Sequence, residues 1–233
     1  MQIAIIPARG GSKRIPRKNI RPFGGQPMIT WPIAAALNSR LFDAVVVTTD
    51  DDEIAALAEK AGAQVPFRRP ANLADDLTPT RPVINHAITQ MEKQSGQRVS
   101  QACCIYATAA LITPDDLIAA HALLQDDPAT RFVFAAADYP HPVQRAMVRT
   151  PGGGVEMLFA EHAGTRSQDL PEALHDAGLF YWGARDAFLQ GAPMFAAHSQ
   201  PLVIPRTRAQ DIDTPEDWAF AEALLALQDR AGS

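Results

Sequence analysis

A loop near the N-terminus carries residue types that bind phosphate groups. It follows an apolar run at residues 3–6, and Gly10 and Gly11 let its backbone approach a ligand and turn N–H groups toward it. Five cations lie in the same loop: Arg9, Lys13, Arg14, Arg17 and Lys18. This composition predicts a site for a di- or triphosphate. A solvated basic turn is the alternative interpretation.

This loop matches neither of two common phosphate-binding motifs. No GxxxxGK[ST] sequence occurs, so the loop is not a Walker A loop. The GxGxxG fingerprint of dinucleotide-binding proteins is also absent. The chemistry must therefore be inferred from the charges and from what else the chain supplies.

Two carboxylates late in the chain form a candidate metal site. Asp211 and Asp213 are separated by one residue, which places both side chains on one side of an extended segment. Two hard oxygen ligands, completed by phosphate oxygens and water, suit Mg²⁺. In the alternative interpretation, Asp213 caps the following helix and Asp211 is a solvated surface charge.

The charge is unevenly distributed along the 233 residues. The chain has 21 Lys and Arg against 26 Asp and Glu, a net charge of −5. Residues 1–42 hold seven of the basic residues and no acidic ones, so this segment carries +7 and the remainder −12. An acidic total argues against a general nucleic-acid coat protein, whereas a basic N-terminus predicts a local anion site.

The apolar content is that of a folded protein without a membrane span. At 47% hydrophobic residues, disorder over most of the length is excluded. No apolar run reaches the 18–20 residues of a bilayer span, and Arg9 comes too early for a secretory signal, so we expect a cytoplasmic protein. Cys103 and Cys104 are adjacent in an apolar run, which excludes a disulfide scaffold.

Apolar runs alternate with helical patterns along the chain. The predicted strands are residues 3–6, 44–48, 64–67, 102–106 and 132–136. The predicted helices are residues 28–37, 54–61, 83–91, 114–124 and 215 to about 231. Thr113 and Thr214 each precede a proline and have an acidic residue three positions on, which is a helix-capping pattern. The alternation predicts an α/β fold with a doubly wound, mostly parallel sheet.

The alternation stops in the third quarter of the chain, where Pro, Gly and His become frequent and residues 151–154 resemble a hairpin tip. We therefore predict one α/β domain from residues 1–137 and 178–233. Residues 138–177 are predicted to be an inserted arm that pairs with another subunit.

Several segments carry a resemblance to a known family. Residues 6–19, IPARGGSKRIPRKN, resemble the signature of the acylneuraminate cytidylyltransferases, the CMP-nonulosonate synthetases. Similar segments follow at residues 48–50, 69–76, 165–170 and 211–214, so the resemblance covers nearly the whole chain. Residues 105–109 and 175–182 are most similar to members acting on pseudaminic acid. The resemblance implies a Rossmann-like nucleotidyltransferase fold with a small inserted dimerisation arm.

The resemblance also implies a reaction. CTP and a nine-carbon α-keto acid sugar would give a CMP-sugar and diphosphate, in the synthesis of bacterial surface glycans or glycosylated flagellin. Pseudaminic acid, a 5,7-diacetamido nonulosonate, is the implied sugar. N-acetylneuraminate, legionaminate and 3-deoxy-manno-octulosonate are the alternatives. The implied cofactor is Mg²⁺, with Mn²⁺ as a substitute, and the implied assembly is a homodimer.

Matching the family's motifs residue by residue assigns roles to individual side chains. Nucleotide binding falls to Ala8, Arg9, Gly10, Gly11, Ser12, Lys13, Lys18, Asn19, Arg69, Asp76 and Thr80. Sugar binding falls to Tyr106, Thr108, Arg166, Gln168 and Tyr181. The catalytic set is Arg9, Lys18, Asp211 and Asp213, and the two aspartates hold the metal.

Some of these roles are specific. Lys18 would stabilise the transferring phosphoryl group, and Arg69 and Thr80 would face cytosine with support from Asp76. Arg166 would meet the sugar carboxylate. Core packing is the alternative for Tyr181.

Two functions from other classes compete with this one. A non-catalytic nucleotide-binding module could keep the basic loop, but it would not need the late aspartates. A nucleic-acid binder is disfavoured by the net charge and by the absence of aromatic residues from positions 9–21.

Overall fold

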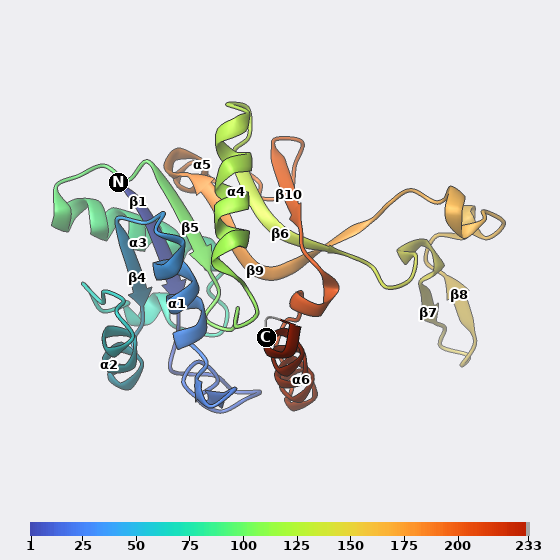
Figure 1. Cartoon of the computed structure of the whole chain (residues 1–233). Helices are drawn as coiled ribbons and strands as arrows, with labels where there is room; N and C mark the ends of the chain where they lie inside the picture. The colour runs from blue at the N-terminus through green and yellow to red at the C-terminus, as the bar shows by residue number, and fades with distance from the viewer. Residues whose placement is uncertain (232–233) are drawn as a thin grey trace.

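The computed structural model describes residues 1–231, with side chains described as far as Gln228. Its centre is a six-stranded sheet in the order β10-β6-β9-β5-β1-β4 (Figure 1). The strands are β1 (Gln2–Pro7), β4 (Ala44–Thr48), β5 (Gln101–Ile105), β6 (Phe132–Asp138), β9 (Leu174–Ala184) and β10 (Ser199–Val203).

The sheet is mostly parallel, as predicted. Strand β1 pairs in parallel with β4 and β5, and β10 pairs in parallel with β6. Strand β9 runs antiparallel to both of its neighbours, β5 and β6. It returns from the inserted arm without a helical crossover, which a parallel neighbour would require.

Helices cover both faces of the sheet, which confirms the doubly wound architecture. Helices α1 (Thr30–Ser39), α2 (Asp52–Lys60) and α4 (Pro114–Asp126) contribute to one apolar cluster. Helices α3 (Thr80–Ser95) and α5 (Arg185–Leu189) contribute to the cluster on the other face. Cys103 belongs to the first cluster and Cys104 to the second, so the adjacent thiols point to opposite faces.

The predicted capping patterns are present at two helix starts. Thr113 Oγ1 accepts from the Asp116 N–H at 3.2 Å, and the Asp116 carboxylate accepts from the Thr113 N–H at 2.8 Å. Thr214 and Asp217 repeat the exchange at the start of α6 (Pro215–Ala231), at 3.2 and 2.7 Å. These reciprocal bonds satisfy N–H groups that a helix start leaves free.

One predicted strand is wrong. Residues 64–67 form no strand: Gln64 makes an isolated bridge with Val46, and Arg68, just beyond the run, makes another with Thr49. Pro66 interrupts this run, and a proline cannot donate to a ladder of hydrogen bonds. Three further features were not predicted from the sequence: β10, α5 and the small hairpin of β2 (Pro22–Phe23) and β3 (Gln26–Pro27).

A third apolar cluster joins the two ends of the chain. Ile15 of the basic loop and Ile212 are both fully buried in it, together with Trp218 of helix α6. Leu111, which follows β5 and precedes α4, packs in the same cluster. The basic loop is therefore fixed against the segment that carries the late aspartates.

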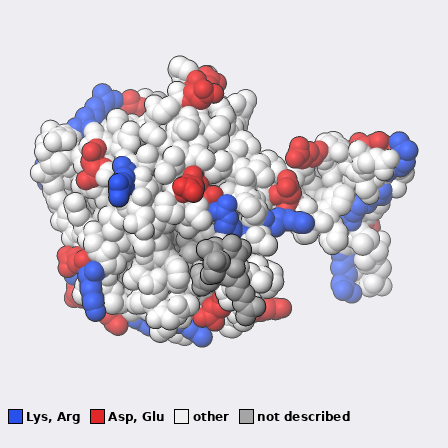
Figure 2. Space-filling model, viewed as in Figure 1, with Lys and Arg blue, Asp and Glu red and all other residues white. Residues whose placement is uncertain are grey.

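The arm leaves the sheet at the end of β6 and returns at the start of β9. Its hairpin consists of β7 (Met147–Arg149) and β8 (Val155–Met157), and residues 150–154 form the predicted tip. The arm stands out from the rest of the molecule and carries both basic and acidic side chains (Figures 1 and 2). Because β9 begins at Leu174, the last residues of the predicted insertion belong to the sheet.

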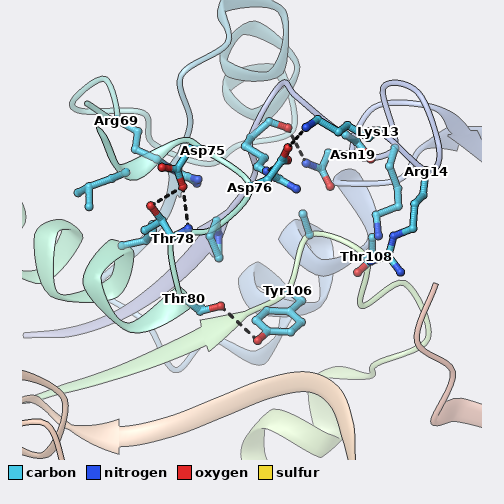
Figure 3. A pocket seen from close by; sticks show the side chains of 17 residues that line it. Lys13, Arg14, Asn19, Arg69, Asp75, Asp76, Thr78, Thr80, Tyr106 and Thr108 are labelled. Atoms are coloured by element: carbon cyan, nitrogen blue, oxygen red, sulfur yellow. Dashed lines mark hydrogen bonds and ion pairs between the residues drawn. The ribbon is translucent and has the colours of Figure 1, made fainter. Parts of the chain in front are cut away.

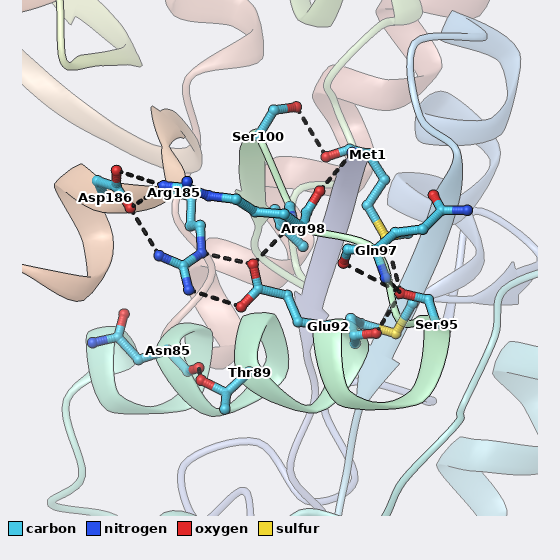
Figure 4. Close-up of polar contacts among 12 residues, drawn as sticks. Met1, Asn85, Thr89, Glu92, Ser95, Gln97, Arg98, Ser100, Arg185 and Asp186 are labelled. Atoms are coloured by element: carbon cyan, nitrogen blue, oxygen red, sulfur yellow. Dashed lines mark hydrogen bonds and ion pairs between the residues drawn. The ribbon is translucent and has the colours of Figure 1, made fainter.

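An ion-pair cluster joins α3 to α5 beside the starts of β1 and β5 (Figure 4). Glu92 accepts from Arg185 Nε at 2.6 Å and from its Nη2 at 2.8 Å. Asp186 accepts from Arg185 at 2.8 Å and from Arg98 at 2.9 Å.

Within residues 1–231, no helix has the length and apolar character that crossing a bilayer would demand.

Candidate active site

A cavity of about 530 Å³ opens at the carboxyl ends of the central strands (Figure 3). Its wall includes Pro7 at the end of β1, Tyr106 and Thr108 directly after β5, and Thr80 at the start of α3. Ligands of open α/β sheets bind beyond the carboxyl ends of the strands, so the cavity lies where the topology predicts a site.

Most of the predicted nucleotide-binding residues line this cavity. Those that do are Arg9, Ser12, Lys13, Lys18, Asn19, Arg69, Asp76 and Thr80, joined by the predicted sugar-binding residues Tyr106 and Thr108. Asn19 holds the loop from inside, because its Nδ2 donates to the Arg9 carbonyl at 2.9 Å. Arg14, one of the five cations of the predicted phosphate-binding loop, also lines the cavity, and five further lining residues were not predicted: Leu73, Asp75, Thr78, Val83 and Ala107.

The two loop glycines and Ala8 belong to the loop but do not line the cavity. The Gly10 N–H donates to Asp50 Oδ1 at 3.1 Å, and the Ala8 N–H donates to the Thr48 carbonyl at 3.0 Å. A Cβ on Gly10 would lie 2.7 Å from Asp51 Oδ2, so a larger residue here would have to displace the Asp51 carboxylate. In this structure Gly10 allows close packing against α2 rather than presenting its N–H to the cavity.

Arg17 does not contribute its charge to the cavity. Its guanidinium turns toward the start of α2 and pairs with Asp51, at 2.5 Å, and with Glu53. The hydrogen bond from Arg17 lowers the pKa of the Asp51 carboxyl. The expectation that all five loop cations face one ligand is therefore wrong for Arg17.

The other four loop cations are bridged in pairs by two carboxylates. Asp76 contacts both Arg9 and Lys13. Asp213 lies 2.8 Å from Arg14 and 3.4 Å from Lys18. Hydrogen bonds from Lys13 and Arg9 lower the pKa of Asp76, so its carboxyl is ionised at neutral pH. The cations of the cavity are therefore partly neutralised by the carboxylates of Asp76 and Asp213.

Arg69 is a buried cation with no carboxylate partner within 4 Å among the residues described. Only 7% of it is exposed. Its Nε donates to Thr48 Oγ1 at 3.3 Å, and its Nη2 donates to the Thr48 carbonyl. Burial lowers the pKa of Arg69 to about 10. Buried charges without a counter-ion are destabilising, and perturbed groups of this kind concentrate at functional sites.

Asp211 and Asp213 lie behind the cations rather than in the cavity wall. Lys18 Nζ donates to the Ile212 carbonyl between them at 2.6 Å. Burial and the neighbouring Asp213 raise the pKa of Asp211. Thr214 occupies the capping position of α6, and Asp213 faces Arg14 and Lys18 instead. The alternative in which Asp213 caps that helix is therefore wrong.

The donor set fits a divalent cation. The two aspartates are close enough to repel each other, and an added cation would relieve that repulsion. No group of three or more His, Cys, Asp or Glu side chains suited to a metal occurs in the part of the chain that is described. Phosphate oxygens and water would have to complete the coordination, as is usual for Mg²⁺.

A second cavity of about 280 Å³ adjoins the first and shares Thr80 and Tyr106 with it. Tyr181 lines this second cavity, with its ring centroid 5.5 Å from that of Tyr106. Its hydroxyl donates to Asp176 Oδ2 at 2.5 Å. Burial raises the pKa of Tyr181, so the hydroxyl stays protonated as a donor.

Arg166 and Gln168 lie in the arm, away from both cavities of their own chain. They belong to the short helical segment around Ser167–Asp169, and Arg166 Nε pairs with Asp169 at 2.7 Å. Neither residue lines a cavity described here. The structure of one chain therefore does not bring these two predicted sugar-binding residues to the nucleotide-binding loop.

The model of the cytidylyltransferase family matches residues 3–227. This chain belongs to that family. It is therefore a nucleotidyltransferase, and the predicted membership of the cytidylyltransferases is confirmed.

Curated relatives divide by the sugar in their names. Pseudaminic acid cytidylyltransferase of Campylobacter jejuni is 45% identical over 97% of this chain and 96% of its own. CMP-N,N'-diacetyllegionaminic acid synthase of the same species is 30% identical over 97% and 95%.

A solved structure of CMP:2-keto-3-deoxy-manno-octonic acid synthetase complexed with CTP covers 97% of this chain and 99% of its own. Its TM-score is 0.70 at 18% identity. At that identity the likeness shows the fold alone, and it confirms the nucleotidyltransferase architecture. Cytidylyltransferases of this fold generally use a divalent metal.

Proposed function

We propose that this enzyme transfers CMP from CTP to pseudaminic acid and releases diphosphate. The observation that carries the choice of sugar is the 45% identity to a pseudaminic acid enzyme across nearly the whole of both chains, against 30% for a legionaminic acid enzyme. We place the reaction in the cytoplasm, in the synthesis of a bacterial surface glycan or glycosylated flagellin.

The reaction is an in-line displacement at phosphorus. The anomeric hydroxyl oxygen of the sugar bonds to the α-phosphorus as the bond from that phosphorus to the bridging oxygen of the diphosphate breaks. The hydroxyl loses its proton, and the diphosphate carries away the negative charge. Such transfers depend on positioning and charge stabilisation more than on covalent catalysis by the protein.

The loop cations hold the triphosphate in this proposal. Arg9, Ser12 and Lys13 bind its outer phosphates, and Lys18 stabilises the group being transferred. Support comes from their shared position on the cavity wall. Removing one such preorganised donor typically lowers turnover by about a hundredfold or more.

Asp211 and Asp213 hold Mg²⁺, with Mn²⁺ as a substitute. When bound, the ion neutralises charge on the triphosphate. The residues themselves support the assignment: two repelling carboxylates lie on an extended segment fixed to Lys18 through the Ile212 carbonyl. Asp213 would exchange its contacts with Arg14 and Lys18 for the ion, which frees both cations for phosphate oxygens.

Arg69 and Thr80 bind the cytosine base, and Tyr106, Thr108 and Tyr181 bind the sugar. Support for the base site is the buried, unpaired guanidinium in the cavity wall. Support for the sugar site is the adjoining cavity, whose shared wall at Tyr106 joins it to the nucleotide cavity.

The assembly proposed is a homodimer in which the arm of one subunit reaches the sugar site of its partner. The arm exposes apolar side chains at Met147, Val155 and Leu158, which are 63%, 64% and 55% exposed. Its Arg166 and Gln168 line neither cavity of their own chain, so a second subunit would give them a role in sugar binding.

Product analysis tests the proposal. The enzyme is incubated with CTP, Mg²⁺ and one sugar at a time: pseudaminic acid, legionaminate, N-acetylneuraminate or 3-deoxy-manno-octulosonate. We expect a CMP-sugar by mass spectrometry, and matching diphosphate release, with pseudaminic acid above the others. Faster turnover of another sugar would change the substrate. CTP binding without product from any of them would favour a non-catalytic module.

A further inference from the structure

We propose that Asp76 is an internal competitor for the diphosphate product: it occupies Arg9 and Lys13 when no phosphate is bound, is displaced by CTP, and returns to expel diphosphate. This inference rests on the proposed function, because it assigns the two cations to the outer phosphates of CTP. It gives Asp76 a role in the release step, distinct from supporting the base.

The contacts place Asp76 where a phosphate oxygen would be. Its two carboxylate oxygens are divided between partners, Oδ1 on Arg9 and Oδ2 on Lys13. All three side chains line the cavity, and Lys13 reaches Asp76 across the opening (Figure 3). A carboxylate that bridges two cations makes the same kind of contact as a phosphate bound to both, so the two anions exclude each other.

Asp76 lies on a segment that can move at a small cost in free energy. Its neighbour Leu77 is 89% exposed, so no apolar anchor holds this part of the loop to the core. The adjacent turn is closed locally, because Asp75 accepts from the N–H and the hydroxyl of Thr78 at 2.7 Å each. The turn can therefore shift as a unit without breaking these bonds.

Asp213, the other bridging carboxylate, is held differently. It follows Ile212, which is 1% exposed and belongs to the cluster that joins the two ends of the chain. In the proposed function Asp213 passes from its two cations to the metal, whereas the ion pairs that Asp76 makes with described residues are those with Arg9 and Lys13. Asp76 is therefore the bridging carboxylate that returns to its cations when diphosphate leaves.

In this exchange one anion replaces another on the same two cations. Displacing Asp76 costs free energy, and this cost lowers the affinity of every polyphosphate that binds to Arg9 and Lys13. Tight binding of diphosphate would slow its release, and binding CTP far more tightly than needed does not raise turnover. Cytidine carries no phosphate that could compete with Asp76 for Arg9 and Lys13, so this inference expects Asp76 to leave cytidine binding unchanged.

Calorimetry with diphosphate and with cytidine, each alone, tests this inference without the sugar. Asp76→Asn removes the charge but keeps the size of the side chain. We expect diphosphate to bind the variant at least fivefold more tightly than the wild type, with cytidine affinity unchanged within twofold. Diphosphate should also be a stronger product inhibitor of the variant. Asp52→Asn is the matched control, because Asp52 pairs with Arg68 outside the cavity.

Unchanged or weaker diphosphate binding to Asp76→Asn would overturn the inference, since Asp76 would then be ordering the cations rather than competing for them. Weaker cytidine binding would also overturn it and return Asp76 to the base site. Asp76→Ser provides a second variant with the same expectations. If wild-type protein binds neither CTP nor diphosphate, the proposed function fails; if it binds both and the variants do not differ from it, only this inference fails.

Discussion

Lys18 Nζ donates to the main-chain carbonyl of Ile212 at 2.6 Å, although 194 residues separate the two. Burial of Ile15 and Ile212 in one apolar cluster holds the same two segments together. The basic loop and the late aspartates are therefore a single unit of the site. A change at either end should be felt at the other.

Lys18→Ala should lower turnover by about a hundredfold or more, because one preorganised cation near the transferring phosphoryl group is lost. The fold should lose only about 1.5–3 kcal/mol, the usual value of one hydrogen bond that involves a charged group. Diphosphate release and thermal unfolding measure the two effects. Arg21→Ala is the control, since Arg21 packs over the ring of Trp218 outside the cavity. A loss of turnover below threefold would remove Lys18 from the catalytic set.

Asp213→Asn should raise the Mg²⁺ concentration needed for half-maximal turnover. The variant keeps the shape of the side chain but loses a charged oxygen ligand. The variant also pairs more weakly with Arg14 and Lys18, which leaves these cations available to phosphate oxygens. CTP affinity at saturating Mg²⁺ should therefore not fall along with the affinity for Mg²⁺. Turnover measured against Mg²⁺ concentration gives the answer, and an unchanged curve would leave Asp213 as a partner of the two cations only.

Arg69→Met should separate binding from stability. The variant removes a cation that is 7% exposed and has no carboxylate partner among the described residues, but it also takes away one of the two donors to the Thr48 carbonyl, whose other donor is the Ala8 N–H. These effects oppose each other, so the free energy of unfolding should change by no more than about 1–2 kcal/mol. Cytidine affinity should fall at least tenfold. Cytidine binding at wild-type strength would show that the base lies elsewhere.

Glu92→Gln should destabilise the protein at neutral pH but not in acid. The hydrogen bonds from Arg185 lower the pKa of Glu92 in the folded state. An acid whose pKa is lowered on folding adds stability above its unfolded pKa, about 4.3, and loses it as the pH falls through the folded value. We expect about 1 kcal/mol at pH 7, reduced by partial exposure. Denaturant unfolding across pH 3–7 should show the difference closing toward the acid end, and a constant difference would contradict the linkage.

The exposed apolar residues of the arm give a test of assembly. Met147→Glu and Val155→Glu together should convert a dimer to monomers, because charged side chains oppose burial between subunits. Light scattering measures the mass, and calorimetry with CTP checks that the nucleotide site remains intact. Sugar KM should rise with dissociation. A wild-type monomer in solution would remove the partner role from Arg166 and Gln168.

Short sequence patterns correctly predicted those features of the fold that depend on residues close together in the chain. Thr113 caps α4 because its hydroxyl and the Asp116 carboxylate lie within one turn of each other. The adjacent cysteines occupy opposite faces because strand geometry requires it. The basic loop leaves β1 at the edge of the sheet where ligands bind, as the order of elements implied.

Contacts between distant segments were beyond the sequence. Arg17 and Lys18 are neighbours of the same charge, yet Arg17 turns to Asp51 and Lys18 to Ile212. Which partner each takes depends on where α2 and the C-terminal segment pack. The orientation of β9 was equally hidden, because residues 177–184 are apolar on both faces whether the strand runs parallel or antiparallel.

The antiparallel β9 has a consequence for how this protein can diversify. The excursion between Asp138 and Leu174 starts and finishes on hydrogen-bonded neighbours, since those two residues are themselves paired. The length and sequence of this segment can thus change while the strands of the six-stranded sheet keep their register. If the arm acts as proposed, replacing it with the corresponding segment of a relative would change which sugar or partner subunit is bound, and CTP binding would remain with the sheet domain.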